Sequence, residues 1–152
     1  MKLDIRRLTG GDAEVYADRY CDLIGQLTDI SRVTPAMRRA YFSLTLNKGA
    51  WVFGAFDNGE LVGITSLHFI PHMKGIEARI EDVVTHEPRR KQGICNALRS
   101  HIDNLLPNFS ASFAPFDIYK ITLQAEPSAE AMYEKSFGYH RDETGWRRDP
   151  WW

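Results

Sequence analysis

The fold is decided by one stretch, IEDVVTHEPRRKQGICNAL, which runs from Ile80 to Leu98. It predicts a strand, a short basic loop and the first turns of a helix. Before the loop, Ile76, Ala78 and Ile80 alternate with polar residues, as is typical of a half-buried strand. After the loop, apolar residues recur at helical spacing, at Ile94, Ala97, Leu98, Ile102 and Leu105.

The loop between strand and helix predicts an anion site. Its final part, Arg90-Lys91-Gln92-Gly93-Ile94-Cys95, places free backbone amides at a helix N-terminus. Unpaired amides and the helix dipole both favour negative charge, so such an end suits phosphate. Gly93 lets the backbone approach a ligand closely, and Arg89, Arg90 and Lys91 add attraction. The alternative is a basic loop that binds no ligand.

The spacing Arg90-x-x-Gly93-x-Cys95 resembles motif A of the GCN5-related N-acetyltransferases, with Cys95 where Gly or Ala is usual. That family binds the pyrophosphate of acetyl-CoA on this loop. The resemblance also implies that the backbone of 83–85 hydrogen-bonds the pantetheine arm as though it were a further strand. The implied acetyl-CoA-binding residues are Val83, Val84, Thr85, Arg89, Arg90, Lys91, Gln92, Gly93, Ile94, Cys95 and Tyr133.

Composition limits the class of protein. A chain of 152 residues predicts one domain spanning 1–152, and a net charge of −1 argues against a general nucleic-acid or membrane-surface binder. No apolar run approaches the roughly 20 residues that cross a bilayer. Cys21 and Cys95 are too few for a disulfide framework, and the spacing of His68, His72 and His86 is not that of a metal site. We therefore expect a cytoplasmic protein without a metal.

The first half of the chain predicts a strand, two helices and a hairpin. A strand is expected over 1–8, and a helix whose apolar face carries Tyr16, Tyr20, Leu23, Ile24 and Leu27. Thr34-Pro35 has the form of a helix start, and that helix should end near Asn47. The expected hairpin joins 51–56 to 61–70 through Asp57-Asn58-Gly59.

The second half adds strand, helix and strand. A strand is expected over 118–123, then a helix capped by Ser128 and ended by Gly138, then a final strand pair over 139–149. The stretch 107–115 has the composition of a loop. The fold class is α/β (α+β), a mixed sheet of six to seven strands flanked by four helices in the order β-α-α-β-β-β-α-β-α-β(-β). This is the acetyltransferase architecture.

Glu81 and Asp82 are the candidate catalytic carboxylates. They lie where the apolar alternation slips by one residue, from Ile80 to Val83 and Val84, which predicts a β-bulge that redirects side chains. We expect Glu81 to be the base or to hold a water, and Asp82 to contact or orient the substrate. The alternative is that one of the pair is a surface carboxylate with an arginine partner.

Tyr133 is the candidate general acid for the departing thiolate. A buried tyrosine on a helix is more often a packing residue, but Tyr133-Glu134-Lys135 resembles the last helix of one group within the family, the glucosamine-6-phosphate N-acetyltransferases. Other segments similar to that group are Gln26-Leu27-Thr28, 80–84, 119–123 and 137–139. The implied substrate-binding residues are Thr28, Glu81, Asp82, Tyr119, Lys120, Arg147 and Arg148.

The resemblance implies transfer of an acetyl group from acetyl-CoA to the primary amine of a small, phosphorylated amino sugar, by direct attack in a ternary complex. It also implies a homodimer joined through the C-terminal strand. Trp146, Trp151 and Trp152 beside two arginines could instead suggest nucleic acid, but a strand at a subunit interface is the better interpretation. Two other functions stay open, acetylation of another amine (aminoalkylphosphonate, polyamine or drug) and a non-catalytic acyl-CoA-binding module.

Overall fold

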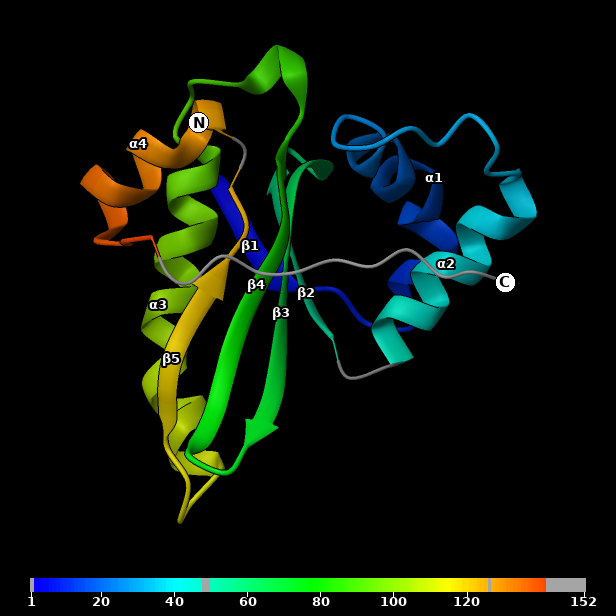
Figure 1. The fold of residues 1–152 in the computed structure, drawn as a ribbon. Helices are drawn as coiled ribbons and strands as arrows, with labels where there is room; N and C mark the ends of the chain where they lie inside the picture. The colour runs from blue at the N-terminus through cyan, green and yellow to red at the C-terminus, as the bar shows by residue number, and fades with distance from the viewer. Residues whose placement is uncertain (1, 48–49, 126, 142–152) are drawn as a thin grey trace, which may run out of the picture.

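The computed structural model describes residues 2–47, 50–125 and 127–141. Its elements follow the predicted order through the last helix (Figure 1). They are β1 Leu3–Arg7, α1 Asp12–Ile24, α2 Pro35–Asn47, β2 Trp51–Asp57, β3 Glu60–His72, β4 Gly75–Thr85, a 3₁₀ turn Glu87–Arg89, α3 Ile94–Ser112, β5 Ile118–Leu123 and α4 Pro127–Phe137.

The described strands form one mixed sheet in the order β1-β2-β3-β4-β5. Neighbouring strands are antiparallel except β4 and β5, which run parallel because α3 carries the chain back across the sheet. Helices α1 and α2 lie on one side of the sheet, and α3 and α4 lie on the other (Figure 1). The mixed α+β architecture is therefore the predicted one.

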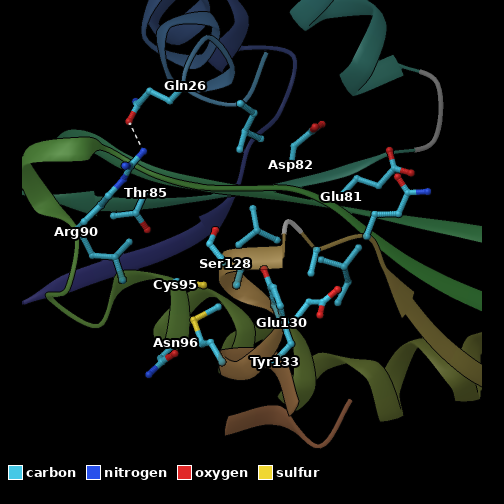
Figure 2. Close-up of a pocket in the computed structure, with 18 of the residues that line it drawn as sticks. Gln26, Glu81, Asp82, Thr85, Arg90, Cys95, Asn96, Ser128, Glu130 and Tyr133 are labelled. Atoms are coloured by element: carbon cyan, nitrogen blue, oxygen red, sulfur yellow. Dashed lines mark hydrogen bonds between the residues drawn. The ribbon is translucent and has the colours of Figure 1, made fainter. Parts of the chain in front are cut away.

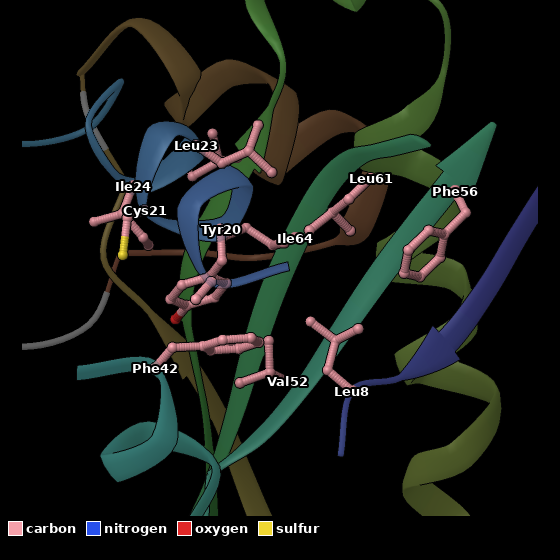
Figure 3. Packing of buried hydrophobic residues seen from close by; sticks show 12 residues of the cluster. Leu8, Tyr20, Cys21, Leu23, Ile24, Phe42, Val52, Phe56, Leu61 and Ile64 are labelled. Atoms are coloured by element: carbon pink, nitrogen blue, oxygen red, sulfur yellow. The ribbon is translucent and has the colours of Figure 1, made fainter. Parts of the chain in front are cut away.

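Each side of the sheet has its own apolar core. On the side of α1 and α2, the rings of Tyr20 and Phe42 stack with centroids 4.3 Å apart above Val52 (Figure 3). On the other side, α3 buries Ile94, Leu98 and Ile102 against the strands, which is the face that the helical spacing predicted. Together these two layers fix the sheet between the helix pairs.

Local turn and capping signals are confirmed where the sequence was most specific. Asn58 and Gly59 both have positive φ, 51° and 83°, as a two-residue hairpin turn between β2 and β3 requires. The Thr34 hydroxyl accepts a hydrogen bond from the Met37 amide at 3.3 Å, so Thr34 caps α2 as predicted.

Three expectations about helix bounds are wrong. Helix α3 does not stop at Pro107 but continues to Ser112, although proline disfavours a helix interior. Beyond the proline, the Phe109 ring still packs against the rings of Trp51 and Phe69, with centroids 4.6 and 5.2 Å away, which holds this part of the helix against the sheet. Helix α1 ends at Ile24, so Leu27 lies beyond it and is half exposed. Ser128 is not a cap, because α4 already begins at Pro127.

The structure describes five strands, where six to seven were predicted. The difference lies at the end of the chain. Residues 139–141 form no strand, and the rest of the expected strand pair lies outside the described residues. Among the described helices, none is long and apolar enough to cross a bilayer.

Candidate functional site

A pocket of about 1450 Å³ lies where β4, the start of α3 and α4 meet (Figure 2). It gathers side chains from segments far apart in the sequence. Its lining residues are Gln26, Leu27, Ile80, Glu81, Asp82, Val83, Thr85, Arg90, Lys91, Gly93, Ile94, Cys95, Asn96, Gln124, Ala125, Ser128, Ala129, Glu130, Met132 and Tyr133.

The predicted β-bulge is present at the centre of this pocket. Ser66 pairs with Glu81 and Ile64 pairs with Val84, so two residues of β4 lie opposite Thr65 alone. Asp82 adopts a positive φ of 53°, an uncommon conformation for a residue other than glycine. The bulge thus interrupts the alternation of the strand at the two candidate carboxylates.

The two carboxylates differ in their surroundings. Glu81 is exposed, whereas Asp82 is partly buried. Both lie on the side of β4 that faces α1 and α2 (Figure 2). Burial raises the pKa of Asp82 above its ordinary value, and the neighbouring charge of Glu81 raises it further. A carboxylate with a raised pKa accepts a proton more readily near neutral pH.

The start of α3 has the geometry of an anion site. Gly93 caps the helix in the left-handed conformation with φ 81°, and no side chain caps the amides of the first turn. A Cβ atom built on Gly93 would meet nothing within 4 Å, so the space beside it is open. Lys91, also at positive φ, and Arg90 line the same pocket. Free amides, helix dipole and two cations therefore converge.

The edge of β4 that faces β5 is open beside this loop. Pairing with β5 extends from Ile76 to Ile80, whose partner is Leu123, and beyond Ile80 no strand of the described residues pairs with β4 on that side up to Thr85. Val83 and Thr85 line the pocket along this unpaired edge. Its backbone groups are available to an extended ligand in the way that a sheet edge accepts another strand.

Tyr133 and Cys95 lie on the opposite side of β4 from the carboxylates (Figure 2). Burial raises the pKa of Tyr133 to about 12, so its hydroxyl stays protonated at neutral pH. Burial also raises the pKa of the Cys95 thiol. The pocket therefore presents proton acceptors on one side of the strand and a neutral proton donor on the other.

Most of the predicted acetyl-CoA residues lie together, but three do not line the pocket. Val84 packs in the core between the sheet and α1. Arg89 turns away to form an ion pair with Asp57 of β2. Gln92 is exposed at the loop surface.

Fewer of the predicted substrate-binding residues line the pocket. Glu81 and Asp82 line the pocket, but Thr28 is exposed beside it, and Tyr119 and Lys120 lie farther along β5. Arg147 and Arg148 lie outside the described residues.

The sequence analysis missed several residues of the pocket. Gln26 belongs to the segment that suggested Thr28, and its side-chain oxygen accepts a hydrogen bond from Arg90 at 3.5 Å (Figure 2). Gln124 follows the predicted strand, and Glu130 lies on the last helix one turn before Tyr133. Glu130 also pairs with Arg141 at 2.6 Å. Positions just after a strand and one turn from a candidate tyrosine are signals that could have found them.

Comparison with known proteins gives a consistent result. The sequence model of the acetyltransferase (GNAT) family matches residues 17–139. A search of curated proteins found no significant match.

Solved structures with the same fold include an acetyltransferase from Trypanosoma brucei, 23% identical, with a TM-score of 0.73 over 98% of this chain and 100% of that one. Glucosamine-6-phosphate N-acetyltransferase from Arabidopsis thaliana is 18% identical, with a TM-score of 0.75 over 98% and 99%. An aminoglycoside acetyltransferase from an uncultured soil metagenomic sample, in complex with sisomicin, is 15% identical, with a TM-score of 0.75 over 97% and 96%.

Proposed function

Because the chain belongs to the acetyltransferase (GNAT) family, it is an acyltransferase, and we propose that it acetylates the primary amine of a small phosphorylated amino sugar such as glucosamine 6-phosphate, with acetyl-CoA as donor. One observation carries the proposal. The bulged carboxylates of β4, the free amides at the start of α3 and Tyr133 of α4 all border one pocket. Amine and thioester can therefore meet in a ternary complex by direct attack.

The pocket fits the chemistry of acetyl-CoA. The uncapped amides at the start of α3, with Arg90 and Lys91, suit a pyrophosphate. The unpaired edge of β4 at Val83 and Thr85 suits the amide groups of a pantetheine arm. When bound, acetyl-CoA supplies an acetyl group as a thioester.

Asp82 is the better supported base. An alkyl amine with a pKa near 10 is mostly protonated at neutral pH, so a group of the protein must take its proton before or during attack. The sequence favoured Glu81, but Glu81 is exposed and Asp82 is partly buried with a raised pKa. We therefore assign Asp82 as the base that takes the proton of the amine, and Glu81 as the residue that orients the amine or a water.

We assign the second proton to Tyr133. Loss of the acetyl group leaves a thiolate, which a neutral phenol can protonate or stabilise by a hydrogen bond. Its pKa of about 12 keeps Tyr133 in the neutral, donating form. Its side chain is 7% exposed, so packing on α4 holds the ring in place.

The amino-sugar acceptor and the homodimer rest on the resemblance of the sequence. In this proposal Arg147 or Arg148, contributed by the partner subunit, meets the substrate phosphate together with Lys120 and Thr28 of the same chain as the pocket. Sedimentation at micromolar concentration tests the dimer, and a monomeric intact chain would contradict it.

A thiol-release assay tests the activity directly. Acetyl-CoA is supplied with glucosamine 6-phosphate, glucosamine, aminoethylphosphonate or spermidine, and both free thiol and N-acetylated product are measured. We expect equal amounts of thiol and product, with the highest kcat/KM for glucosamine 6-phosphate. Preference for another amine would contradict the proposed acceptor but not the proposed acetyl transfer. Binding of CoA without turnover of any amine would indicate a non-catalytic acyl-CoA-binding module.

A further inference from the structure

A buried carboxylate on β4 organises a group of charged side chains outside the pocket. Glu77 is only 2% exposed, although it occupies a polar position in the alternation of the strand. Its neighbours Ala78 and Ile80 pack towards α3, so alternation along the strand places Glu77 on the opposite face of the sheet. The alternation within the strand does not indicate that a glutamate here is buried.

Four side chains bind this carboxylate. His72 Nε2 lies 2.8 Å from Oε2, and Lys120 Nζ lies 3.7 Å from the same oxygen. Arg79 donates from Nε and Nη2 to Oε1 at 3.2 and 3.0 Å, and the Thr122 hydroxyl donates to Oε1 at 2.6 Å. Burial alone would raise the pKa of Glu77, but the bonds from Thr122, His72 and Arg79 together lower it to about 2.

The charges of this group do not cancel. One carboxylate faces two permanent cations, Arg79 and Lys120, so the group has a net charge of +1 even when His72 is neutral. The arginine side chain is 44% exposed and the lysine side chain 38%, so both cations remain accessible to an anion from solvent. Because Glu77 already holds the arginine and lysine side chains in place, binding an anion costs little of their side-chain entropy.

The two cations lie on the same face of the sheet as the candidate catalytic carboxylates. Arg79 and Glu81 are two residues apart on β4, a rise of about 6.6 Å along a strand. On β5, Thr122 pairs with Arg79, and Gln124 two residues later lines the pocket. On the side of α1 and α2, the end of the β3–β4 hairpin extends past α2, whereas α3 covers its other side (Figure 1).

We propose that Arg79 and Lys120, held by Glu77, bind an oxyanion of the acceptor, a phosphate or a carboxylate, while the acceptor's amine lies at Glu81 and Asp82. The inference rests on the proposed acetyl transfer. It selects acceptors whose anionic group and amine are separated by roughly the length of one sugar ring, because that matches the two-residue rise between Arg79 and Glu81. It also gives Glu77 a role as a positioning residue that does not touch the substrate.

The test compares three sugars that differ only at C6: glucosamine, its 6-phosphate and its uronic acid. Arg79→Gln and Lys120→Gln should each raise KM by about tenfold or more for the two anionic sugars, because a charge-assisted hydrogen bond contributes about 1.5–3 kcal/mol. The KM for glucosamine and all kcat values should stay within about twofold of wild type. A larger effect on the phosphate than on the carboxylate identifies phosphate as the preferred oxyanion.

Arg6→Gln is the matched control. Arg6 is also an arginine on a strand of the sheet, its side chain is 40% exposed against 44% for Arg79, and it likewise pairs with a carboxylate, Asp12, at 2.8 Å. It lies on β1, at the other edge of the sheet from β5. This variant should leave KM unchanged for every sugar. If Arg79→Gln fails to fold, Lys120→Gln still tests the proposal. It removes only the longest contact to Glu77, at 3.7 Å, so we expect it to fold.

Equilibrium binding separates this inference from the proposed function. Calorimetry measures the affinity of glucosamine 6-phosphate for the CoA-loaded protein, which requires no turnover. We expect weaker binding by about tenfold in both test variants and no change in Arg6→Gln. Equal affinity in folded wild type and test variants, or no binding by wild type, would overturn the oxyanion site. Absence of acetyl transfer with intact binding would overturn only the proposed function.

Discussion

The hydroxyl of Ser66 donates a hydrogen bond to the backbone carbonyl of Glu81 at 3.1 Å, across the bulge between β3 and β4. The same hydroxyl lies 3.5 Å from Oδ2 of Asp82. Ser66 is buried, so one small side chain stabilises both the interrupted backbone and the orientation of the carboxylate beside it. The geometry of the two candidate carboxylates therefore depends on a residue of the neighbouring strand.

The first prediction separates the two carboxylates. Asp82→Asn should lower kcat by roughly 10²- to 10⁴-fold, the usual contribution of a general base. In wild type, kcat/KM should fall as pH drops through the raised pKa of Asp82, because the protonated carboxyl cannot accept the amine's proton. That acidic limb should disappear in the variant. Glu81→Gln is the matched control, and a larger loss in Glu81→Gln than in Asp82→Asn would return the base to Glu81.

The second prediction concerns the loop at the start of α3. Gly93→Ala should weaken CoA binding by about tenfold or more, since an L-residue at this positive φ costs about 1–2 kcal/mol and shifts the amides that face the ligand. Gly59→Ala is a matched control, with φ 83° against 81° and equally open space, but in the β2–β3 turn. Equal CoA affinities in the two variants, measured by calorimetry, would remove the loop from the binding site.

The third prediction tests the proton donor. Tyr133→Phe keeps the ring and its packing, so it should lower kcat by roughly 10²- to 10⁴-fold and leave CoA affinity nearly constant. Tyr139→Phe is the control, because its ring lies 5.9 Å from that of Tyr133 but outside the pocket. If kcat of Tyr133→Phe stays within about threefold of wild type while chemistry limits the rate, the thiolate takes its proton from water.

The fourth prediction concerns acid stability. The pKa of Glu77 is about 2 in the folded protein, below the ordinary glutamate value of 4.5, so its ionised form stabilises the fold. That contribution, about 3 kcal/mol from a shift of this size, is fully present above about pH 4.5 and is lost as pH falls towards 2.

In Glu77→Gln the free energy of unfolding should therefore change less between pH 5 and pH 2 than in wild type. Urea unfolding at several pH values measures this difference. Parallel curves for the two proteins would contradict the assignment of a stabilising ionised carboxylate to Glu77.

Local periodicity was sufficient to predict the parts of the fold that neighbouring residues determine. The slip from Ile80 to Val83 predicted the bulge correctly, because a bulge shifts the two-residue alternation within one strand. Asn58-Gly59 specified the hairpin turn through its own backbone preferences. In these places the physical cause lies within a few residues of the observation.

Long-range partners determined what the sequence could not predict. Arg89 belongs to the basic loop by position, but Asp57 of β2 draws it away from the pocket. Glu77 has the alternation of a solvent-facing residue, yet partners from β3, β4 and β5 bury it. Pro107 predicted a helix end, but α3 continues past it, and Phe109 beyond the proline packs on Trp51. Pattern within one segment carries no information about such contacts.

The parallel pairing of β4 with β5 sets the order in which the protein acquires its pocket during synthesis. The β3–β4 hairpin can form as soon as both strands leave the ribosome, because it closes only a short loop. Strand β5 can pair with β4 only after the whole of α3 has been made, and the wall that α4 supplies comes later still. A nascent chain without residues 124–133 therefore has its bulge and its anion loop but lacks one side of the pocket.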